Sequence, residues 1–202
     1  FSHGGYSMRE NSIYVIGDIG DILYTRDNQA LVKVKTEREG NKVYDVLVKM
    51  DKENKLIGSG KRVYIKGRLE VDYYFCGDEK KFAYIVPEKI KLLDKDFNIQ
   101  KLDEFYKDYT AHNRIYLKGE IGRNILYRSV HDKGGVYKFT IIFDNGKHVI
   151  HCDVWDNVNN SKGLQEGLKV GITGLFSVSD VQGKKGRYKL YKILVQKLDI
   201  LD

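Results

Sequence analysis

The sequence contains little cysteine, proline or tryptophan: its 202 residues include two cysteines, one proline and one tryptophan. Cys76 and Cys152 are far apart in the chain and form no framework of paired cysteines, as is typical of a reducing compartment. No apolar run approaches the ~20 residues of a membrane-spanning helix, and no signal peptide is visible. We therefore expect a cytoplasmic protein that makes no contact with a membrane.

The chain also lacks the motifs of catalysis and of metal binding. No G-x-G-x-x-G or P-loop pattern opens a helix, and the carboxylates are scattered without a nucleophile–base set. His148, His151 and Cys152 suggest zinc, but His151 and Cys152 are neighbours on a predicted strand and must point to opposite faces. We predict neither an enzyme nor a site for a metal or a cofactor.

The sequence does contain the same passage twice. NSIYVIGDIG at 11–20 corresponds to NRIYLKGEIG at 113–122, with an offset of 102 residues (113 − 11). GKRVYIKGRL at 60–69 corresponds to GLKVGITGLF at 167–176, with an offset of 107 (167 − 60). Two matches in the same order, one small domain apart, indicate a duplicated domain, because a solenoid repeats every ~20–50 residues.

Both repeats have a β pattern, with alternating apolar positions, 15 tyrosines in the chain and turns rich in glycine or charge. Five strands are predicted in each repeat, at 12–19, 29–37, 42–50, 61–70 and 81–92, and at 114–121, 136–143, 147–155, 168–176 and 187–199. Five strands are the count of an OB fold, a small, partly open Greek-key barrel. We expect an all-β fold of two tandem five-stranded OB-fold Greek-key barrels.

The predicted domains follow from these repeats. Residues 1–10 are an N-terminal arm or an expression remnant, 11–93 the first OB fold and 113–202 the second. Between them, 94–112 reads as a linker with a short helix, because Leu102, Phe105, Tyr106 and Tyr109 have helical spacing. Further short helices are expected in the slots between strands three and four, at 51–60 and 156–167.

Trp155 is the strongest candidate for a binding residue. In the strand HVIHCDVW at 148–155, Ile150, Cys152 and Val154 form one apolar face, so His151, Asp153 and Trp155 lie on the other. An exposed indole on a polar face predicts a platform on which a nucleic-acid base stacks. The alternative is that a loop or the other barrel covers it.

The first repeat offers further aromatic and basic candidates on its fourth strand. Val63 and Ile65 fit the core, so Tyr64, Lys66 and Arg68 are expected to face outward. The strand continues into three consecutive aromatic residues, of which at least one must be exposed or covered by another subunit. These three are Tyr73, Tyr74 and Phe75.

Basic residues recur on strand faces and turns, and the chain has 35 Lys and Arg against 28 Asp and Glu, a formal net charge of +7. A basic surface favours polyanions. Lys33 and Lys35 alternate with apolar residues, which fits either a phosphate-tracking groove or protection of an edge strand. After Phe176, the second repeat has a hairpin tip whose basic residues serve either phosphate binding or solubility: Lys184, Lys185 and Arg187.

At these motifs the chain resembles the bacterial single-stranded DNA-binding protein (SSB) family. The resemblance is carried by N-x-x-x-L/V-x-G at 11–17 and 113–119, by VIHCDVWDNV at 149–158, by the two strand-four phrases, and by the closing strands KKFAYIVPEKIKLLD and GRYKLYKILVQKLDIL. It implies that Trp155 and Tyr74 stack on bases. The position equivalent to Trp155 in the first repeat is then about Lys49. The position equivalent to Tyr74 in the second repeat is about Val181. It also implies a homodimer that presents four OB folds.

The function expected from residues and resemblance together is binding of single-stranded DNA with low sequence specificity, through exposed aromatics and a basic groove. The role would be DNA replication, recombination or repair, with replication or recombination proteins as further partners. Two alternatives stay open. One is a primosome-type OB protein that acts mainly through protein partners, and the other is an OB protein that binds RNA.

Overall fold

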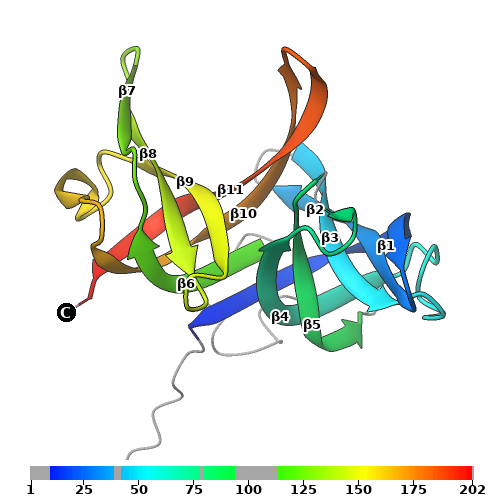
Figure 1. The fold of residues 1–202 in the computed structure, drawn as a ribbon. Coiled ribbons are helices and arrows are strands. Elements are labelled where there is room, and N and C mark those ends of the chain that lie inside the picture. Colours follow the sequence, from blue (N-terminus) through cyan, green and yellow to red (C-terminus); the bar gives the residue numbers. More distant parts are fainter. Residues whose placement is uncertain (1–9, 39–41, 78–79, 94–112, 202) are drawn as a thin grey trace, which may run out of the picture.

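The computed structural model describes residues 10–38, 42–77, 80–93 and 113–201, and within them the chain is almost entirely β-structure (Figure 1). The first repeat forms five strands: β1 (Asn11–Arg26), β2 (Gln29–Arg38), β3 (Lys42–Asp51), β4 (Arg62–Asp72) and β5 (Phe82–Leu92). The second forms six: β6 (Asn113–Ile121), β7 (Leu126–Val130), β8 (Gly134–Phe143), β9 (His148–Trp155), β10 (Lys169–Gly183) and β11 (Gly186–Ile200).

Each repeat closes into its own barrel. In the first, β1 pairs with β2, β2 with β3, β3 with β5, β5 with β4, and β4 again with β1. In the second, β6, β8, β9, β11 and β10 form the same ring, and β7 extends it beside β8. The predicted fold of two tandem OB barrels is confirmed.

The two barrels are joined by antiparallel pairing of their first strands. Ile13 of β1 faces Ile115 of β6, and these two residues are equivalent in the repeats, since 115 − 13 = 102. The flanking pairs obey the same rule: Asn11 faces Leu117 (117 − 102 = 15) and Val15 faces Asn113 (113 − 102 = 11). The barrels are therefore related by a local two-fold axis through this isoleucine pair, as in an isologous dimer within one chain.

The asparagine of the repeated motif has the same structural role in both barrels. Asn11 Nδ2 donates to the Leu69 carbonyl (2.8 Å) and its Oδ1 accepts from the Leu69 N–H (2.9 Å). Asn113 makes the same pair of bonds with Phe176, whose N–H donates to Asn113 Oδ1 (3.0 Å). Each side-chain amide thus replaces a strand neighbour for a backbone that would otherwise lack hydrogen bonds.

A glycine bulge marks a second equivalent point. The ladder between the fourth and fifth strands shifts register between Lys66 and Gly67, and between Thr173 and Gly174 in the second barrel. At both glycines the opposite carbonyl oxygen comes so close that an added Cβ would lie 2.2 Å from it. Only glycine permits this approach. Gly67 and Gly174 are therefore equivalent positions, and they align the residues of the first barrel with those of the second.

The predicted short helices are mostly wrong. Residues 51–60 form turns, and 156–167 contain only one 3-10 turn, η4 (Ser161–Gly163). The reason is local: the Glu53 N–H donates to Asp51 Oδ1 (2.9 Å) and the Leu56 N–H to Asn54 Oδ1, so side chains hold these amides in turns instead of a helix. The helix expected within 94–112, and the domain boundaries placed there, lie outside the described residues.

The strand β7 was not predicted, and β1 runs on to Arg26, well beyond the predicted end at 19. Within the described ranges, no helix is long and apolar enough to span a membrane.

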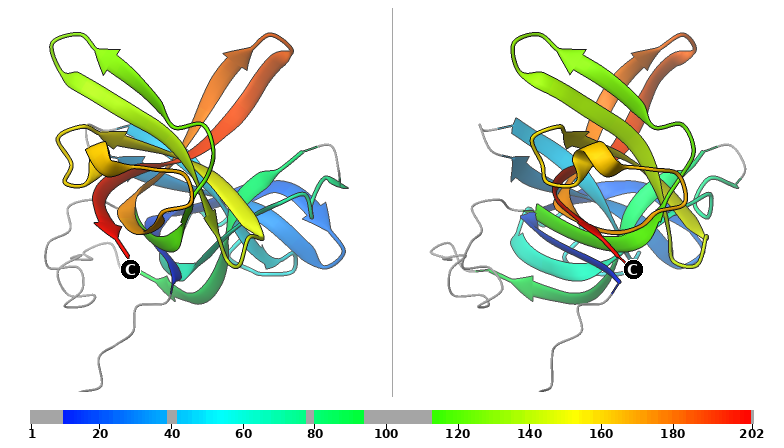
Figure 2. Two further views of the ribbon diagram at one scale, coloured as in Figure 1. Left: turned by 60° about the vertical axis from the view of Figure 1, so that its left-hand side comes forward. Right: turned by 90° about the vertical axis from the view of Figure 1, so that its left-hand side faces the viewer.

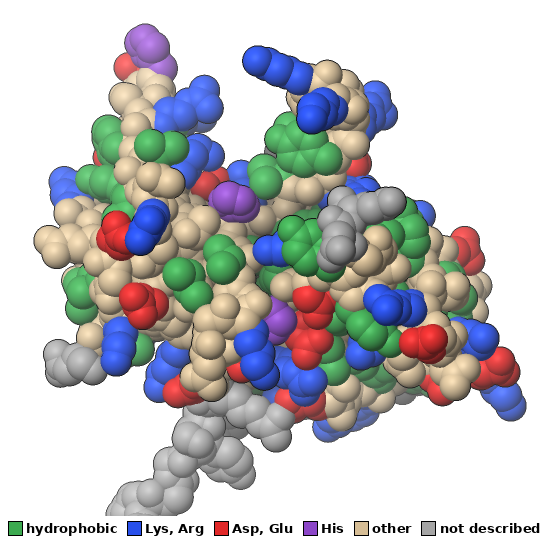
Figure 3. Space-filling model, viewed as in Figure 1, with side chains coloured by type: hydrophobic (Ala, Val, Ile, Leu, Met, Phe, Trp, Pro, Cys, Tyr) green, Lys and Arg blue, Asp and Glu red, His purple; other side chains and the backbone are tan. Residues whose placement is uncertain are grey.

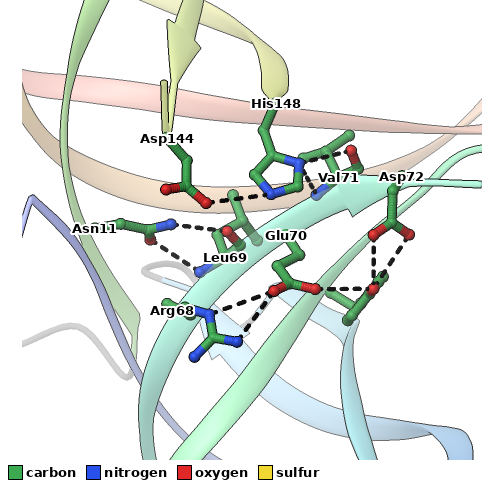
Figure 4. A network of polar contacts seen from close by, with 9 residues as sticks. Asn11, Arg68, Leu69, Glu70, Val71, Asp72, Asp144 and His148 are labelled. Carbon is green, nitrogen blue, oxygen red and sulfur yellow. Dashed lines mark hydrogen bonds and ion pairs between the residues drawn. The ribbon is translucent and has the colours of Figure 1, made fainter. Parts of the chain in front are cut away.

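Side chains also link the barrels away from the paired strands (Figure 4). His148, which is 7% exposed, contacts the Val71 backbone of the first barrel through Nδ1, which lies 3.3 Å from the Val71 nitrogen and 3.0 Å from its carbonyl oxygen. Its Nε2 lies 3.6 Å from Asp144 Oδ2. Asn113 donates to the hydroxyl of Tyr44 on β3. These contacts set the second barrel against the first at more than one place.

Replacing Asn113 by alanine should lower the free energy of unfolding by about 1–3 kcal/mol, because the Phe176 amide would stay buried without its partner. Asn157→Ala, at an exposed position of a turn, is the matched control and should stay within about 0.5 kcal/mol. Urea unfolding followed by circular dichroism measures both. An Asn113→Ala protein as stable as the control would refute the structural role of this amide.

Candidate nucleic-acid interface

Two hairpins of the second barrel project from the same side of the molecule and diverge, as Figures 1 and 2 show: β7–β8 and β10–β11. Between them lies a groove of about 350 Å³. Figure 3 shows Lys and Arg side chains on both hairpins around this hollow. The residues that line it are Arg123, Asn124, Leu126, Lys138, Phe139, Thr140, His151, Cys152, Asp153, Leu190 and Lys192.

Trp155 lies on the face of β9 that borders this groove. Ile150, Cys152 and Val154 are buried in the core, whereas Trp155 is 42% exposed. The strand-parity prediction that the indole points outward is therefore confirmed. Its cross-strand neighbour is Val136 on β8. The next pairs of β8 and β9 residues on the same face are Lys138 with Asp153 and Thr140 with His151.

Two lysines are held in the groove by one carboxylate. Lys192 Nζ lies 2.8 Å from Asp153 Oδ2, and Lys138 Nζ lies 3.4 Å from Asp153 Oδ1. Lys138 comes from β8 and Lys192 from β11, so Asp153 ties together the two strands that flank β9. Arg123 is the third basic side chain of the lining, and its guanidinium pairs with Glu166 (3.1 Å), so three basic groups face two carboxylates and the groove keeps a small excess of positive charge.

Tyr188 is a second exposed aromatic residue on this face, and the sequence reasoning missed it. It is 47% exposed. Tyr188, Leu190 and Lys192 alternate along β11 and so share one side of the strand, and Lys192 is in register with His151 of β9. The same parity argument that identified Trp155 could have found Tyr188, Lys138 and Lys192.

The hairpin tips carry the predicted basic residues. Lys184, Lys185 and Arg187 are all exposed at the turn between β10 and β11. Below the tip, Lys189 Nζ pairs with Asp180 Oδ1 (2.8 Å), and this ammonium group lowers the pKa of the Asp180 carboxyl. The ion pair crosses from one strand to the other and braces the hairpin.

The other hairpin is braced by an aromatic pair. Tyr127 and Tyr137 face each other across β7 and β8 with ring centroids 4.8 Å apart. The Tyr127 hydroxyl donates to Asp156 Oδ2 (3.1 Å), which raises the pKa of this phenol. Gly135 lies under the ring, where an added Cβ would be 2.1 Å from the hydroxyl oxygen.

Three predicted binding residues belong to the protein interior instead. Tyr64 is 6% exposed and stacks on Tyr14, with ring centroids 6.4 Å apart, so the prediction that it faces solvent was wrong. Phe75 is 7% exposed because its loop folds back onto the barrel. Phe176 is fully buried in the core of the second barrel. None of the three presents a free ring face to a base.

The other aromatic candidates of the first barrel lie close to cations. Tyr73 is 44% exposed, as required of at least one ring in its run, and the Lys81 ammonium lies 5.2 Å from its centroid. Tyr74 is partly buried, with Arg26 at 4.7 Å and Lys49 at 5.2 Å from its ring centroid.

The basic candidates of the first barrel do not share the groove of the second. Lys66 lies 5.5 Å above the Tyr14 ring, and Arg68 pairs with Glu70 (3.2 Å). Lys35 is exposed on β2. Lys33 lines a small cavity of about 90 Å³ between the barrels, beside Lys189 and Tyr191.

Among the described residues, no group of three or more His, Cys, Asp and Glu side chains is arranged to hold a metal ion. Cys152 is fully buried, and burial raises the pKa of its thiol. Both cysteines are free thiols.

The two closed five-stranded rings define a tandem OB fold. In particular, the chain is similar in structure to the wild-type single-stranded DNA binding protein from Thermus aquaticus, with a TM-score of 0.65 and 15% sequence identity, over 95% of this chain and 93% of that one. A deletion variant of the same protein matches with a TM-score of 0.65 and 14% identity, over 95% and 94%. The predicted resemblance is confirmed at the level of the fold.

Neither a protein-family model nor a curated protein sequence matches the chain.

Proposed function

We propose that the protein binds single-stranded DNA with little sequence preference, in the groove between β7–β8 and β10–β11. The observation that carries the proposal is the pairing of two exposed aromatic rings, Trp155 and Tyr188, with a basic groove on one face of an OB barrel. The structural similarity to a protein that binds single-stranded DNA supports it.

The geometry suits this ligand. A base of a single strand has two free π-faces, and stacking on an aromatic side chain is worth ~1–3 kcal/mol per base whatever the base is. Lys138 and Lys192 are oriented by Asp153 at the floor of the groove, and the basic hairpin tip extends the positive surface beyond it. Phosphates that follow this path would release condensed cations.

The cellular role that we propose is DNA replication, recombination or repair, in the cytoplasm and together with proteins of those processes. RNA is the second candidate ligand, because OB folds stack bases of either nucleic acid. A primosome-type role through protein partners is the third, and the exposed side chains Val43, Leu92 and Ile22 on the first barrel are the apolar surface available to it.

Binding should prefer single strands and weaken steeply with salt. The log of the association constant should fall with log salt by about 0.7 per phosphate contacted, since basic side chains dominate the groove. Fluorescence anisotropy with labelled oligo-dT, oligo-U and duplex measures this. Equal affinity for duplex, or an affinity that is constant over a tenfold range of salt, would refute the proposal, and preference for oligo-U would transfer it to RNA.

Trp155 should report binding directly, because it is the sole tryptophan and its fluorescence should be quenched when a base stacks on it. Trp155→Ala should weaken oligo-dT binding by ~1–3 kcal/mol. The protein should lose little stability, because the ring is largely outside the core. Phe176→Ala is the contrasting variant, expected to cost about 3–5 kcal/mol of stability while the folded fraction binds normally. A Trp155→Ala protein that loses stability but, while folded, binds oligo-dT normally would show that Trp155 is a packing residue.

We also propose that the chain forms a homodimer with four OB folds, on the strength of the resemblance to the SSB family. Open edge strands do not argue for it, because among the described strands only β7 pairs on one side alone. Multi-angle light scattering should give twice the mass of the 202-residue chain at micromolar concentration. A monomer mass, both with and without oligo-dT, would contradict the dimer.

A further inference from the structure

The matching outer faces of the two barrels carry very different side chains, and this difference determines where single-stranded DNA can bind. We propose that only the second barrel carries single-stranded DNA, and that the matching face of the first barrel is closed by its own side chains. This inference rests on the proposed function and assigns it to one half of the chain.

The ladders identify the matching positions. Gly67 corresponds to Gly174, so Ile85 opposite Leu69 corresponds to Ile193 opposite Phe176. Ile85 is in register with Val48, as Ile193 is with Cys152. From these anchors, position 51 of the first barrel matches Trp155, whereas the resemblance had suggested about Lys49.

At most of these positions the first barrel lacks the side chains that make up the groove. Trp155 is matched by Asp51 and Tyr188 by Lys80, so neither exposed ring has a counterpart. Three of the polar groove residues are matched by apolar or aromatic ones that are almost fully buried, whereas Thr140 and Asp153 are matched by Lys33 and Lys49. Lys138, His151 and Lys192 correspond to Leu31 (0% exposed), Leu47 (4%) and Tyr84 (1%).

The loop after β4 covers this apolar face. Where β10 and β11 form a long projecting hairpin, the chain after Asp72 turns back, and Phe75 packs on Leu31, Leu47, Phe82 and Tyr84. Its ring meets the Tyr84 ring edge-on, with centroids 5.4 Å apart. Tyr74 packs against the same cluster, and so does Tyr191, which comes from β11 of the second barrel.

Basic side chains beside this face contact the loop. Arg26 lies over the Tyr74 ring and donates to the Tyr74 carbonyl, and Lys49 lies over the same ring. Arg26 faces Gln29 across the first hairpin, as the exposed Arg128 faces Val136 across β7–β8. The arginine that is exposed on β7 in the second barrel is thus matched by one that contacts Tyr74 in the first.

A DNA strand could reach the matching face of the first barrel only if Phe75 left the cluster. Phe82 and Tyr84 would then be exposed to water, at a large cost in folding free energy. The closed face therefore contributes no stacking surface, and the two repeats divide their roles. The first barrel supports the second, through the β1–β6 pairing and the contact with Tyr191.

The test compares exposed aromatic residues of the two barrels in the full chain. Trp155→Ala and Tyr188→Ala should each weaken oligo-dT binding about 5- to 150-fold, as expected for one stacked base. Tyr73→Ala, the matched aromatic variant of the first barrel, should change it less than about twofold, and so should Lys35→Ala on β2. Thermal unfolding by circular dichroism confirms that each variant is folded.

Hydrogen exchange gives an independent readout on the wild-type protein. Oligo-dT should slow exchange in β8, β9 and the β10–β11 hairpin and leave residues 73–77 unchanged. A fivefold or greater loss of affinity in Tyr73→Ala, or slowed exchange at 73–77, would overturn the inference while the proposed function stands. Full affinity in both second-barrel variants would overturn the inference together with the placement of the DNA in this groove. If wild-type protein does not bind oligo-dT at all, the proposed function itself fails and this inference fails with it.

Discussion

The antiparallel pairing of β1 with β6 about Ile13 and Ile115 is the interaction on which the rest of the structure depends. Both isoleucines are completely buried, and the register makes the two first strands equivalent partners, as in a symmetric dimer. Because this pairing fixes the barrels relative to each other, the β10–β11 hairpin passes beside the first barrel. Tyr191 of this hairpin therefore reaches the apolar cluster around Phe75. One strand pair thus determines where the groove lies and what supports it.

Duplication within one chain allows the halves to diverge, since each half can change without its equivalent. The structural elements are retained: the asparagine amides still hold Leu69 and Phe176, and the glycine bulges still lie at Gly67 and Gly174. The outer faces have diverged, one into a basic groove with exposed rings and the other into an apolar cluster. Conserved packing with divergent surfaces explains how the two barrels share a fold without sharing a role.

Much of the fold could be predicted from the sequence because strand alternation is a local signal. The strands, the duplication and the outward orientation of Trp155 all depend on neighbours within one strand. The buried candidates could not be predicted, because their burial depends on distant segments. Phe75 is covered because its loop folds back, and Phe176 belongs to the core on the inner side of β10. The short helices failed because side-chain bonds at Asp51 and Asn54 favour turns.

The groove itself needed the three-dimensional arrangement. Lys138 and Lys192 come from strands that are far apart in the sequence, and only their common partner Asp153 reveals that they act together. Tyr188 was overlooked because its hairpin was judged by charge alone, although its parity on β11 was readable.

Photochemical cross-linking tests the central claim most directly, that the groove of the second barrel holds a single strand. The complex of the 202-residue protein with an oligo-dT in which 5-bromodeoxyuridine replaces thymidine would be irradiated. The peptides linked to the DNA would then be identified by mass spectrometry. Cross-links at Trp155 and Tyr188 are expected. Cross-links confined to the first barrel, for example at Tyr73 or Tyr74, or at Tyr14 on β1, would contradict this claim.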